Sequence, residues 1–297
     1  MPLPLRKNSF ALLLATVGFL FLPSGSHSSD DSSSNEIPVI DAHTHTNFEE
    51  SGAGRPNLQD YLREWQQANV VGAVSHTSRA GKGYVPDLSD RVVFCFGIGN
   101  AVDLAAVENG LRTGRFGCIK IYLGYVYRYA SDAAYAPLYK LAAKYDVPVV
   151  FHTGDTNSEK GKLKYADPLT IDEVAVDNPG VNFVIAHCGN PWIESAAEVA
   201  YKNHNVYLEC SALLTGDLGD RSEQDVETYV VRPISWIFGY VEDPKKLMFG
   251  TDWPLTRIKP YADAYKRAIP QKYWRLVLHD NAANVFHFSR LKSHHVR

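Results

Sequence analysis

The sequence lacks several features that would assign the protein to a particular class. Its 297 residues contain no long run of lysine and arginine, and the net charge is -3, so nothing predicts a surface for nucleic acid. No glycine-rich turn follows the first apolar segment, so a dinucleotide-binding fold has no support. Four cysteines are too few to scaffold a chain of this size. What is present is the composition of an ordinary folded protein, 45% hydrophobic and 21% charged.

The first 28 residues have the pattern of a secretory signal peptide. Arg6 and Lys7 precede the short apolar block Phe10–Pro23, and small residues follow it. The block is short for a membrane span, so no stable membrane anchor is expected, although an uncleaved N-terminal anchor is the alternative. Residues 29–36, rich in serine and aspartate, are predicted to be a flexible leader. We therefore expect an exported protein, periplasmic or secreted.

The cysteines each lie in an apolar, strand-like run. Because a large exported chain does not need disulfides to fold, we predict buried free thiols, with disulfide bonds as the alternative. The residues concerned are Cys95, Cys118, Cys188 and Cys210.

Apolar, β-branched segments recur along the chain and predict eight strands. They are Pro38–Ala42, Val70–Ser75, Arg91–Ile98, Cys118–Leu123, Pro148–Phe151, Asn182–Ala186, Asn205–Glu209 and Lys246–Phe249. Segments with helical periodicity lie between most of them, for example Leu58–Asn69, Ala101–Gly114, Ala134–Asp146 and Pro191–His204.

Strands that alternate with helices predict a parallel α/β sheet. Eight such units over about 260 residues predict a closed (β/α)₈ TIM barrel, a single domain over residues 37–290 with a short C-terminal tail at 291–297. A doubly wound open sheet is the structural alternative. In a barrel, functional side chains stand at the carboxyl ends of the strands, so these positions are where the site should be sought.

Histidines gather at the predicted strand ends. The first strand leads into His43 and His45, whose spacing directs both rings to the same face of a strand. The fifth and sixth strands end at His152 and His187, and the eighth ends at Asp252. Four of the 11 histidines therefore fall at strand ends, which chance scatter would not produce.

A lysine, Lys120, lies within the apolar fourth strand and adds an amine to this set. Each residue alone has an ordinary structural explanation, but burying all of them without partners would cost several kcal/mol. Imidazole and carboxylate together are ligands for a divalent transition metal, zinc above all. The sequence therefore predicts a metal centre at the mouth of the barrel. His76, at the end of the second strand, is left outside the metal set.

These motifs together resemble those of the amidohydrolase superfamily, in the branch that contains decarboxylases, lactonases and hydratases. The resemblance extends over the whole predicted mature chain. It rests on Ile40–His45, Phe151–Thr156, Ile185–Asn190, Gly250–Pro254 and Leu278–Phe286.

The resemblance implies a set of roles. The metal ligands would be His43, His45, His152 and Asp252, while His187 would bind a second ion or contact the substrate. The context Lys-Ile-Tyr around Lys120 resembles the strand-four lysine that is carboxylated in binuclear amidohydrolases. One ion is expected on this basis, and a second ion bridged by that lysine is left open.

The chemistry that follows is hydrolysis. A divalent ion activates water and polarises a carbonyl, so we expect attack on an amide, ester or lactone of a small organic substrate. Asp252 can accept the proton of the water, and His187 can stabilise developing charge. A metal-dependent lyase, a decarboxylase or hydratase of a small carboxylic acid, is the alternative. A metal-binding protein without catalysis is disfavoured because both Asp252 and His187 are present.

Side chains that follow the strands are candidates for substrate binding. An arginine near a metal would suit a substrate carboxylate by bidentate pairing, with a solvated surface arginine as the alternative. The candidates are Tyr125, Arg128, Trp253 and Arg257. The expected partner is a small-molecule substrate and not nucleic acid, and a homo-oligomer is compatible with the sequence.

Overall fold

The computed structural model describes residues 37–48, 56–77 and 83–293. The predicted signal peptide and leader, residues 1–36, lie outside the described residues, so export stays a prediction. The predicted tail begins within a short 3₁₀ helix, η10 (Phe288–Ser293), and its last four residues lie outside the described part. Within the described ranges, no helix is both long and apolar enough to cross a membrane.

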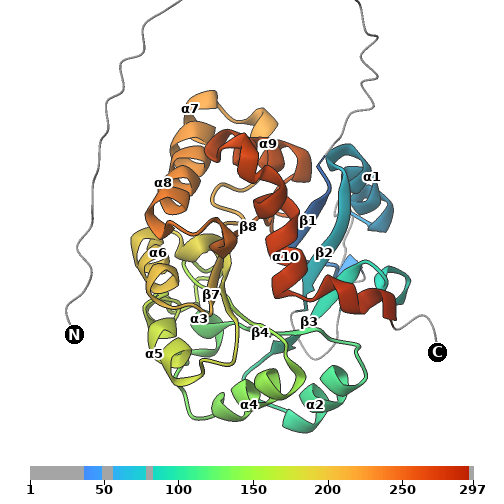
Figure 1. Ribbon diagram of the computed structural model, residues 1–297, viewed down its shortest axis with the longest axis vertical. Coiled ribbons are helices and arrows are strands. Elements are labelled where there is room, and N and C mark those ends of the chain that lie inside the picture. The colour runs from blue at the N-terminus through green and yellow to red at the C-terminus, as the bar shows by residue number, and fades with distance from the viewer. Residues whose placement is uncertain (1–36, 49–55, 78–82, 294–297) are drawn as a thin grey trace, which may run out of the picture. The chain divides into compact units, whose positions relative to one another are not determined.

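Eight parallel strands form one sheet in the order β1 to β8, and helices surround them (Figure 1). This confirms the predicted barrel, and each strand lies within a residue or two of its predicted position. The strands are β1 (Val39–Thr44), β2 (Val70–His76), β3 (Val92–Ile98), β4 (Cys118–Ile121), β5 (Val149–Phe151), β6 (Phe183–Ile185), β7 (Val206–Glu209) and β8 (Leu247–Met248).

The barrel closes between β1 and the segment that follows β8. Backbone hydrogen bonds join Ala42 N to Phe249 O at 2.9 Å and Asp252 N to His43 O at 2.7 Å. The buried carboxylate of Asp41 adds to this seam, since it accepts hydrogen bonds from the backbone and hydroxyl groups of Thr251. The first strand and the last are thereby held side by side at the end of the barrel where the histidines lie.

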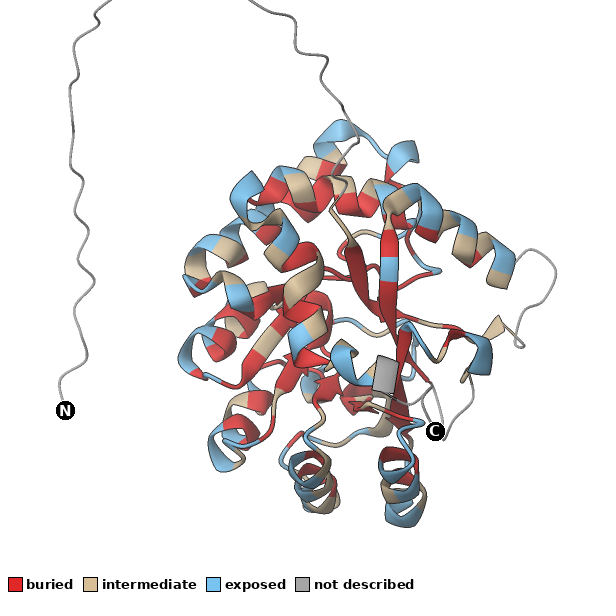
Figure 2. Cartoon of the chain, turned by 45° about the vertical axis from the view of Figure 1, so that its right-hand side comes forward, coloured by how far each residue is buried: buried red, intermediate tan, exposed pale blue. Residues whose placement is uncertain are grey.

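The helices cover the outer face of the sheet, and their outward residues are exposed while the strands are buried (Figure 2). The first of them starts at Asn57, whose side chain accepts the backbone N–H groups of Gln59 and Asp60 in a capping box. The α-helices are α1 (Leu58–Ala68), α2 (Leu104–Arg112), α3 (Leu123–Val126), α4 (Ala136–Tyr145), α5 (Thr170–Asp177), α6 (Ile193–Lys202), α7 (Glu223–Val226), α8 (Arg232–Val241), α9 (Ile258–Ala268) and α10 (Asn281–Val285).

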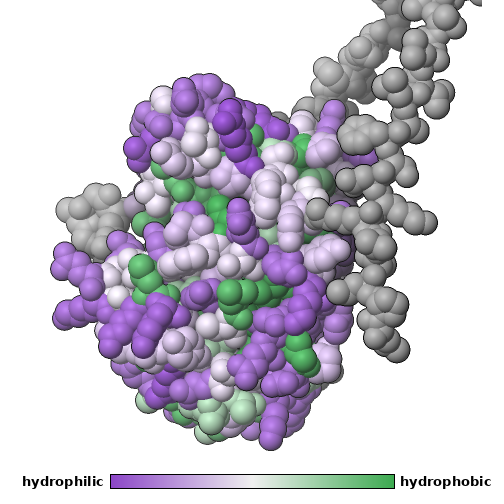
Figure 3. All heavy atoms as spheres, turned by 90° about the vertical axis from the view of Figure 1, so that its left-hand side faces the viewer, coloured by the Kyte–Doolittle hydropathy of each residue, from purple (hydrophilic) through white to green (hydrophobic). Residues whose placement is uncertain are grey.

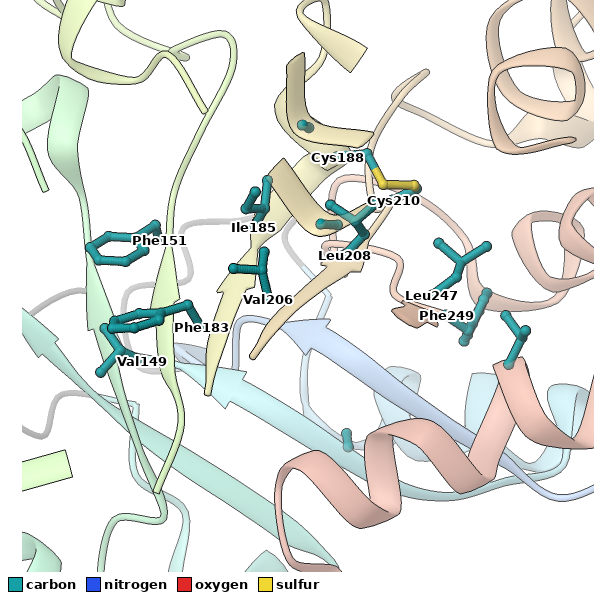
Figure 4. Close-up of a cluster of buried hydrophobic side chains, with 14 of the residues drawn as sticks. Val149, Phe151, Phe183, Ile185, Cys188, Val206, Leu208, Cys210, Leu247 and Phe249 are labelled. Atoms are coloured by element: carbon teal, nitrogen blue, oxygen red, sulfur yellow. A yellow bond between two sulfur atoms is a disulfide. The ribbon is translucent and has the colours of Figure 1, made fainter. Parts of the chain in front are cut away.

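Alternate residues of each strand enter two separate apolar layers. One layer lies between the sheet and the helices and contains Phe151, Phe183 and Leu208 (Figure 4). The other fills the inside of the barrel and contains Val150 and Val184. Figure 3 shows a mostly hydrophilic outer face on which hydrophobic side chains occur in scattered groups. Because apolar side chains fill the inside of the barrel, polar side chains are expected mainly at the ends of the strands.

The cysteine prediction was wrong, because the structure contains two disulfide bonds. Cys95 and Cys118 are register partners on β3 and β4, with their Cα atoms 4.3 Å apart. Cys188 and Cys210 follow β6 and β7, with their Cα atoms 4.6 Å apart. Each pair meets because its two cysteines lie side by side on, or just after, neighbouring parallel strands. The hydrophobic pattern along the chain does not show which residues of two strands lie side by side, so it could not predict these bonds.

Candidate metal centre

His43, in β1, is fully buried and oriented by a carboxylate. Its Nδ1 lies 2.5 Å from Oε1 of Glu209, at the end of β7, so Nδ1 carries the proton and donates it. The other ring nitrogen, Nε2, is buried without a hydrogen-bond partner. Histidines that ligate metals are held in this way, with one nitrogen donating to a carboxylate or carbonyl and the other left free for the ion.

His45 and Asp252 complete a first group with His43. His45 donates from Nδ1 to the backbone carbonyl of His76 at 2.8 Å, which leaves Nε2 3.0 Å from Asp252 Oδ1. Asp252 Oδ1 also lies 3.6 Å from His43 Nε2. Each of the three residues offers one ligand atom, and these atoms lie within 4.8 Å of one another. The two histidines and the aspartate predicted from the sequence are therefore brought together.

His152 and His187 form a second group beside the first. His152 donates from Nε2 to the carbonyl of Asp155 at 2.9 Å, while His187 Nδ1 lies 2.8 Å from the hydroxyl of Ser211. The remaining nitrogens, His152 Nδ1 and His187 Nε2, face each other at 3.1 Å. If each ring donates from its other nitrogen, both facing nitrogens carry lone pairs, an arrangement that a shared cation would stabilise.

Glu209 links the two groups, and the sequence analysis did not identify it as a site residue. Its buried carboxylate accepts hydrogen bonds from His43 Nδ1, from the backbone N–H of His187, and from the N–H and hydroxyl of Ser211. Gly250 leaves the space that it occupies, since a Cβ there would lie 2.5 Å from Oε2. Burial raises the pKa of Glu209, but four donors around two oxygens favour the ionised form.

Lys120 lies on the inner face of β4 and is completely buried. Its Nζ has no hydrogen-bond partner among the described residues. Burial lowers its pKa, although the nearby carboxylates of Glu209 and Asp252 oppose that change. The structure therefore holds a buried amine next to the histidine groups, as the sequence predicted, without a protein partner.

The imidazoles of His43, His152 and His187 are uncharged at neutral pH. Burial, more than any other effect, lowers the pKa of His43, His152 and His187, the last to about 4. Burial alone would raise the pKa of Asp252, but the neighbouring His45 ring, more than any other group, holds it below its ordinary value. Neutral imidazole nitrogens beside an ionised carboxylate are the donor set that divalent zinc prefers. The unpartnered His43 Nε2 and Asp252 Oδ1 fit such an ion.

His76, which the sequence analysis left outside the metal set, lies beside the first group, and its Nδ1 has no hydrogen-bond partner among the described residues. Its ring packs against that of His43 at 4.1 Å, and Nε2 bonds the carbonyl of Ala42 at 3.2 Å. Its backbone carbonyl is what orients His45.

A cavity of about 1030 Å³ opens over the two groups. His45, His152, His187 and Asp252 form part of its wall, and the predicted substrate contact Tyr125 is also there, with its ring 5.0 Å from that of His152. The remaining wall mixes apolar side chains with amides and hydroxyls: Phe96, Ile98, Val126, Leu255, Asn100, Asn157, Thr156 and Thr215.

Three of the four predicted substrate contacts do not line this cavity in the structure. Trp253 is buried against Tyr61 and donates its indole N–H to Glu64 at 3.2 Å. Arg257 pairs with the same carboxylate at 2.7 Å. Neither lines the cavity, since both side chains are directed to Glu64 of α1. Arg128 is likewise absent from the described residues of the cavity wall.

Comparison with known proteins identifies the family of the chain. A sequence model of the amidohydrolase family matches residues 85–288, more than half of the chain. No protein of curated function matches it.

Solved structures with the same fold are distant in sequence. An uncharacterized TIM-barrel protein of Bordetella bronchiseptica is 17% identical, with TM-score 0.64, covering 86% of this chain and all of its own. A probable 2-pyrone-4,6-dicarboxylic acid hydrolase of Acinetobacter baumannii is 13% identical (TM-score 0.60; 84% and 99% covered). The 5-carboxyvanillate decarboxylase of Sphingomonas paucimobilis is 12% identical (TM-score 0.57; 84% and 99%). The barrel, its histidine and aspartate groups and the sequence match lead to one conclusion: the chain is an enzyme that belongs to the amidohydrolase family.

Proposed function

We propose that the enzyme is a metal-dependent hydrolase that cleaves an amide, ester or lactone of a small organic molecule. The observation that carries the proposal is the meeting of two buried, unpartnered ligand atoms, His43 Nε2 and Asp252 Oδ1, beside a cavity large enough for such a substrate. A divalent ion held there, zinc above all for this donor set, would lower the pKa of a water molecule to about 7 and polarise the substrate carbonyl.

The side chains divide the remaining work. Asp252 is ionised and lies at the cavity wall, so it can accept a proton from the attacking water and return it to the leaving group. His187 is oriented by Ser211 with Nε2 unprotonated, which supports a ligand role over donation of a hydrogen bond to the substrate. Tyr125 stays a predicted substrate contact at the rim of the same cavity.

The composition of the cavity wall favours hydrolysis over the lyase reaction. Of the described residues that line it, none is lysine or arginine, while Asp103 and Asp155 add carboxyl groups beside Asp252, so a substrate carboxylate would find no cationic side chain there. Amide and hydroxyl side chains such as Asn100, Asn157 and Thr215 suit an uncharged polar substrate. A decarboxylase or hydratase remains the second candidate, because the similarly folded protein of Sphingomonas paucimobilis is a decarboxylase.

Metal removal and a substrate panel test this proposal. The purified protein is dialysed against a chelator, then restored with Zn²⁺ or Mn²⁺, and assayed on lactones, esters, amides and aromatic carboxylic acids. We expect acid release from a lactone, ester or amide that is lost on dialysis and regained with the metal. Release of carbon dioxide without hydrolysis would establish the lyase instead. Hydrolysis that persists fully in the metal-free protein would contradict the proposal.

Lys120 decides between one ion and two. Its buried, unpartnered amine can add carbon dioxide to form a carbamate, whose two oxygens could bridge the first group to His152 and His187. In protein prepared with ¹³C-bicarbonate we expect a carbamate carbon signal and close to two metal ions per chain. Both should fall in the Lys120→Ala variant, together with activity. A variant that keeps full activity and the metal content of the parent would rule the bridge out.

A further inference from the structure

The Cys188–Cys210 disulfide lies directly behind the second histidine group. It joins the segments that follow β6 and β7, at the carboxyl ends of these strands (Figure 4). Cys188 is the residue next to His187, and Cys210 stands between Glu209 and Ser211. The crosslink therefore connects one metal-site residue to the two residues that orient it.

The backbone at this point is strained. His187 has φ 59° and ψ 19°, Cys188 has φ 46° and ψ 28°, and Gly189 continues with φ 68°. Left-handed conformations are sterically unfavourable for residues with a Cβ, and two in succession persist only when the surroundings impose them. This turn at the end of β6 brings the imidazole of His187 to His152. The strained backbone therefore positions a side chain of the second histidine group.

The end of β7 and the two residues after it contact the turn directly. The backbone N–H of His187 donates to Glu209 Oε1 at 3.1 Å, and its Nδ1 lies 2.8 Å from Ser211 Oγ. Between these two hydrogen bonds, the covalent bond runs from Cys188 to Cys210. Three consecutive residues of one segment thus fix two consecutive residues of the other.

We propose that the Cys188–Cys210 disulfide is a positioning element of the metal centre, which holds the left-handed turn so that His187 faces His152. Its effect on turnover rests on the proposed function, whereas its effect on the His187 ring does not. The other disulfide supplies a matched comparison. Cys95 and Cys118 are also buried and are separated by 23 positions in the sequence, against 22 for Cys188 and Cys210, so similar stabilisation of the fold is expected from both.

The experiment compares two double variants of the whole purified protein, Cys188→Ala/Cys210→Ala and Cys95→Ala/Cys118→Ala. Unfolding temperature, kcat and KM on a p-nitrophenyl ester, and the imidazole N–H signals of the metal-free protein are measured in each. We expect comparable losses of thermal stability. Loss of the first disulfide should lower kcat by about 10- to 100-fold with little change in KM, as a small displacement of a positioned group does. Loss of the second should leave kcat within about twofold.

A glycine variant separates positioning from stability. Cys188→Gly/Cys210→Ala also lacks the crosslink, but glycine adopts a positive φ without steric cost and so favours the same turn. We expect it to recover part of the kcat lost in Cys188→Ala/Cys210→Ala, and it offers a folded alternative if that variant fails to fold. Equal loss of kcat in both disulfide-free pairs, or no loss in either, would overturn the proposal.

The NMR signal keeps the test independent of turnover. In the metal-free parent, His187 Nδ1–H bonded to Ser211 should give a signal protected from exchange. It should persist in Cys95→Ala/Cys118→Ala and disappear in Cys188→Ala/Cys210→Ala. If the ester is not hydrolysed by any of the proteins, the proposed function fails while this comparison still decides the role of the disulfide. Persistence of the signal in both variants would argue against the positioning role.

Discussion

Replacing Glu209 by glutamine should disable the metal centre although only one oxygen is exchanged for an amide nitrogen. Oε1 accepts from His43, His187 and Ser211, and Oε2 accepts from the Ser211 N–H, so an NH₂ group at either position meets a donor. Each buried donor left without an acceptor costs about 1–3 kcal/mol. If the new NH₂ group faces His43, two donors meet, and His43 can accept this hydrogen bond only by carrying its proton on Nε2. Nε2 is then no longer available to bind the ion. We expect metal affinity to fall about 10- to 100-fold, measured by competition with a chromophoric chelator.

Glu64 provides a matched control for this substitution. Its carboxylate also collects three donors, from Trp253, Arg257 and the backbone of Ile258, but it lies outside the metal centre. Glu64→Gln should lower the unfolding temperature and leave metal affinity unchanged. If Glu209→Gln binds the metal as tightly as the parent protein, then Glu209 is only a structural carboxylate.

Removing a single ligand should abolish activity. His43, His45, His152 and Asp252 converge on one region from three places in the sequence, so alanine at any of them leaves an incomplete ligand set. For Asp252→Ala the loss of the proton acceptor adds to the loss of a ligand, and we expect kcat to fall by at least about 10²- to 10⁴-fold. Activity and metal content by atomic absorption are both measured.

His279→Ala is the control for the histidine variants. His279 is a half-buried histidine bonded to Asp280, outside the described residues of the cavity wall. It should retain its metal and its turnover. Full activity with full metal occupancy in His152→Ala would remove His152 from the ligand set.

The fold could be predicted closely because its strands are short apolar runs separated by turn residues. β4, for example, was expected at Cys118–Leu123 and is found at Cys118–Ile121. The histidines could be placed for the same reason, since each directly follows an apolar run. Closure of the barrel then places these strand ends around one opening.

The residues that sequence reasoning missed act through partners distant in the chain. Glu209 ends a strand in which Val206 and Leu208 face the helices, so alternation would have put it on the inner face, but its donors come from β1 and the turn after β6. The disulfide bonds depend on which residues of neighbouring strands lie side by side, and the hydrophobic periodicity of the sequence carries no information about that register. The position of Trp253 outside the cavity also depends on a distant partner, because its indole is buried against Tyr61 and donates to Glu64 of α1.

Because β1 is hydrogen-bonded to the segment after β8, the full set of metal ligands can form only in a chain that has been synthesised to its last strand. His43 and His45 lie near the beginning of the folded chain and Asp252 near its end, and the hydrogen bond from Asp252 N to His43 O joins them only when the last strand has docked. A chain that stops before β8 contains the four metal-site histidines, His43, His45, His152 and His187, but lacks the carboxylate of Asp252. The complete ligand set therefore exists only in the finished barrel, and the free energy of ion binding to that set stabilises the full-length fold.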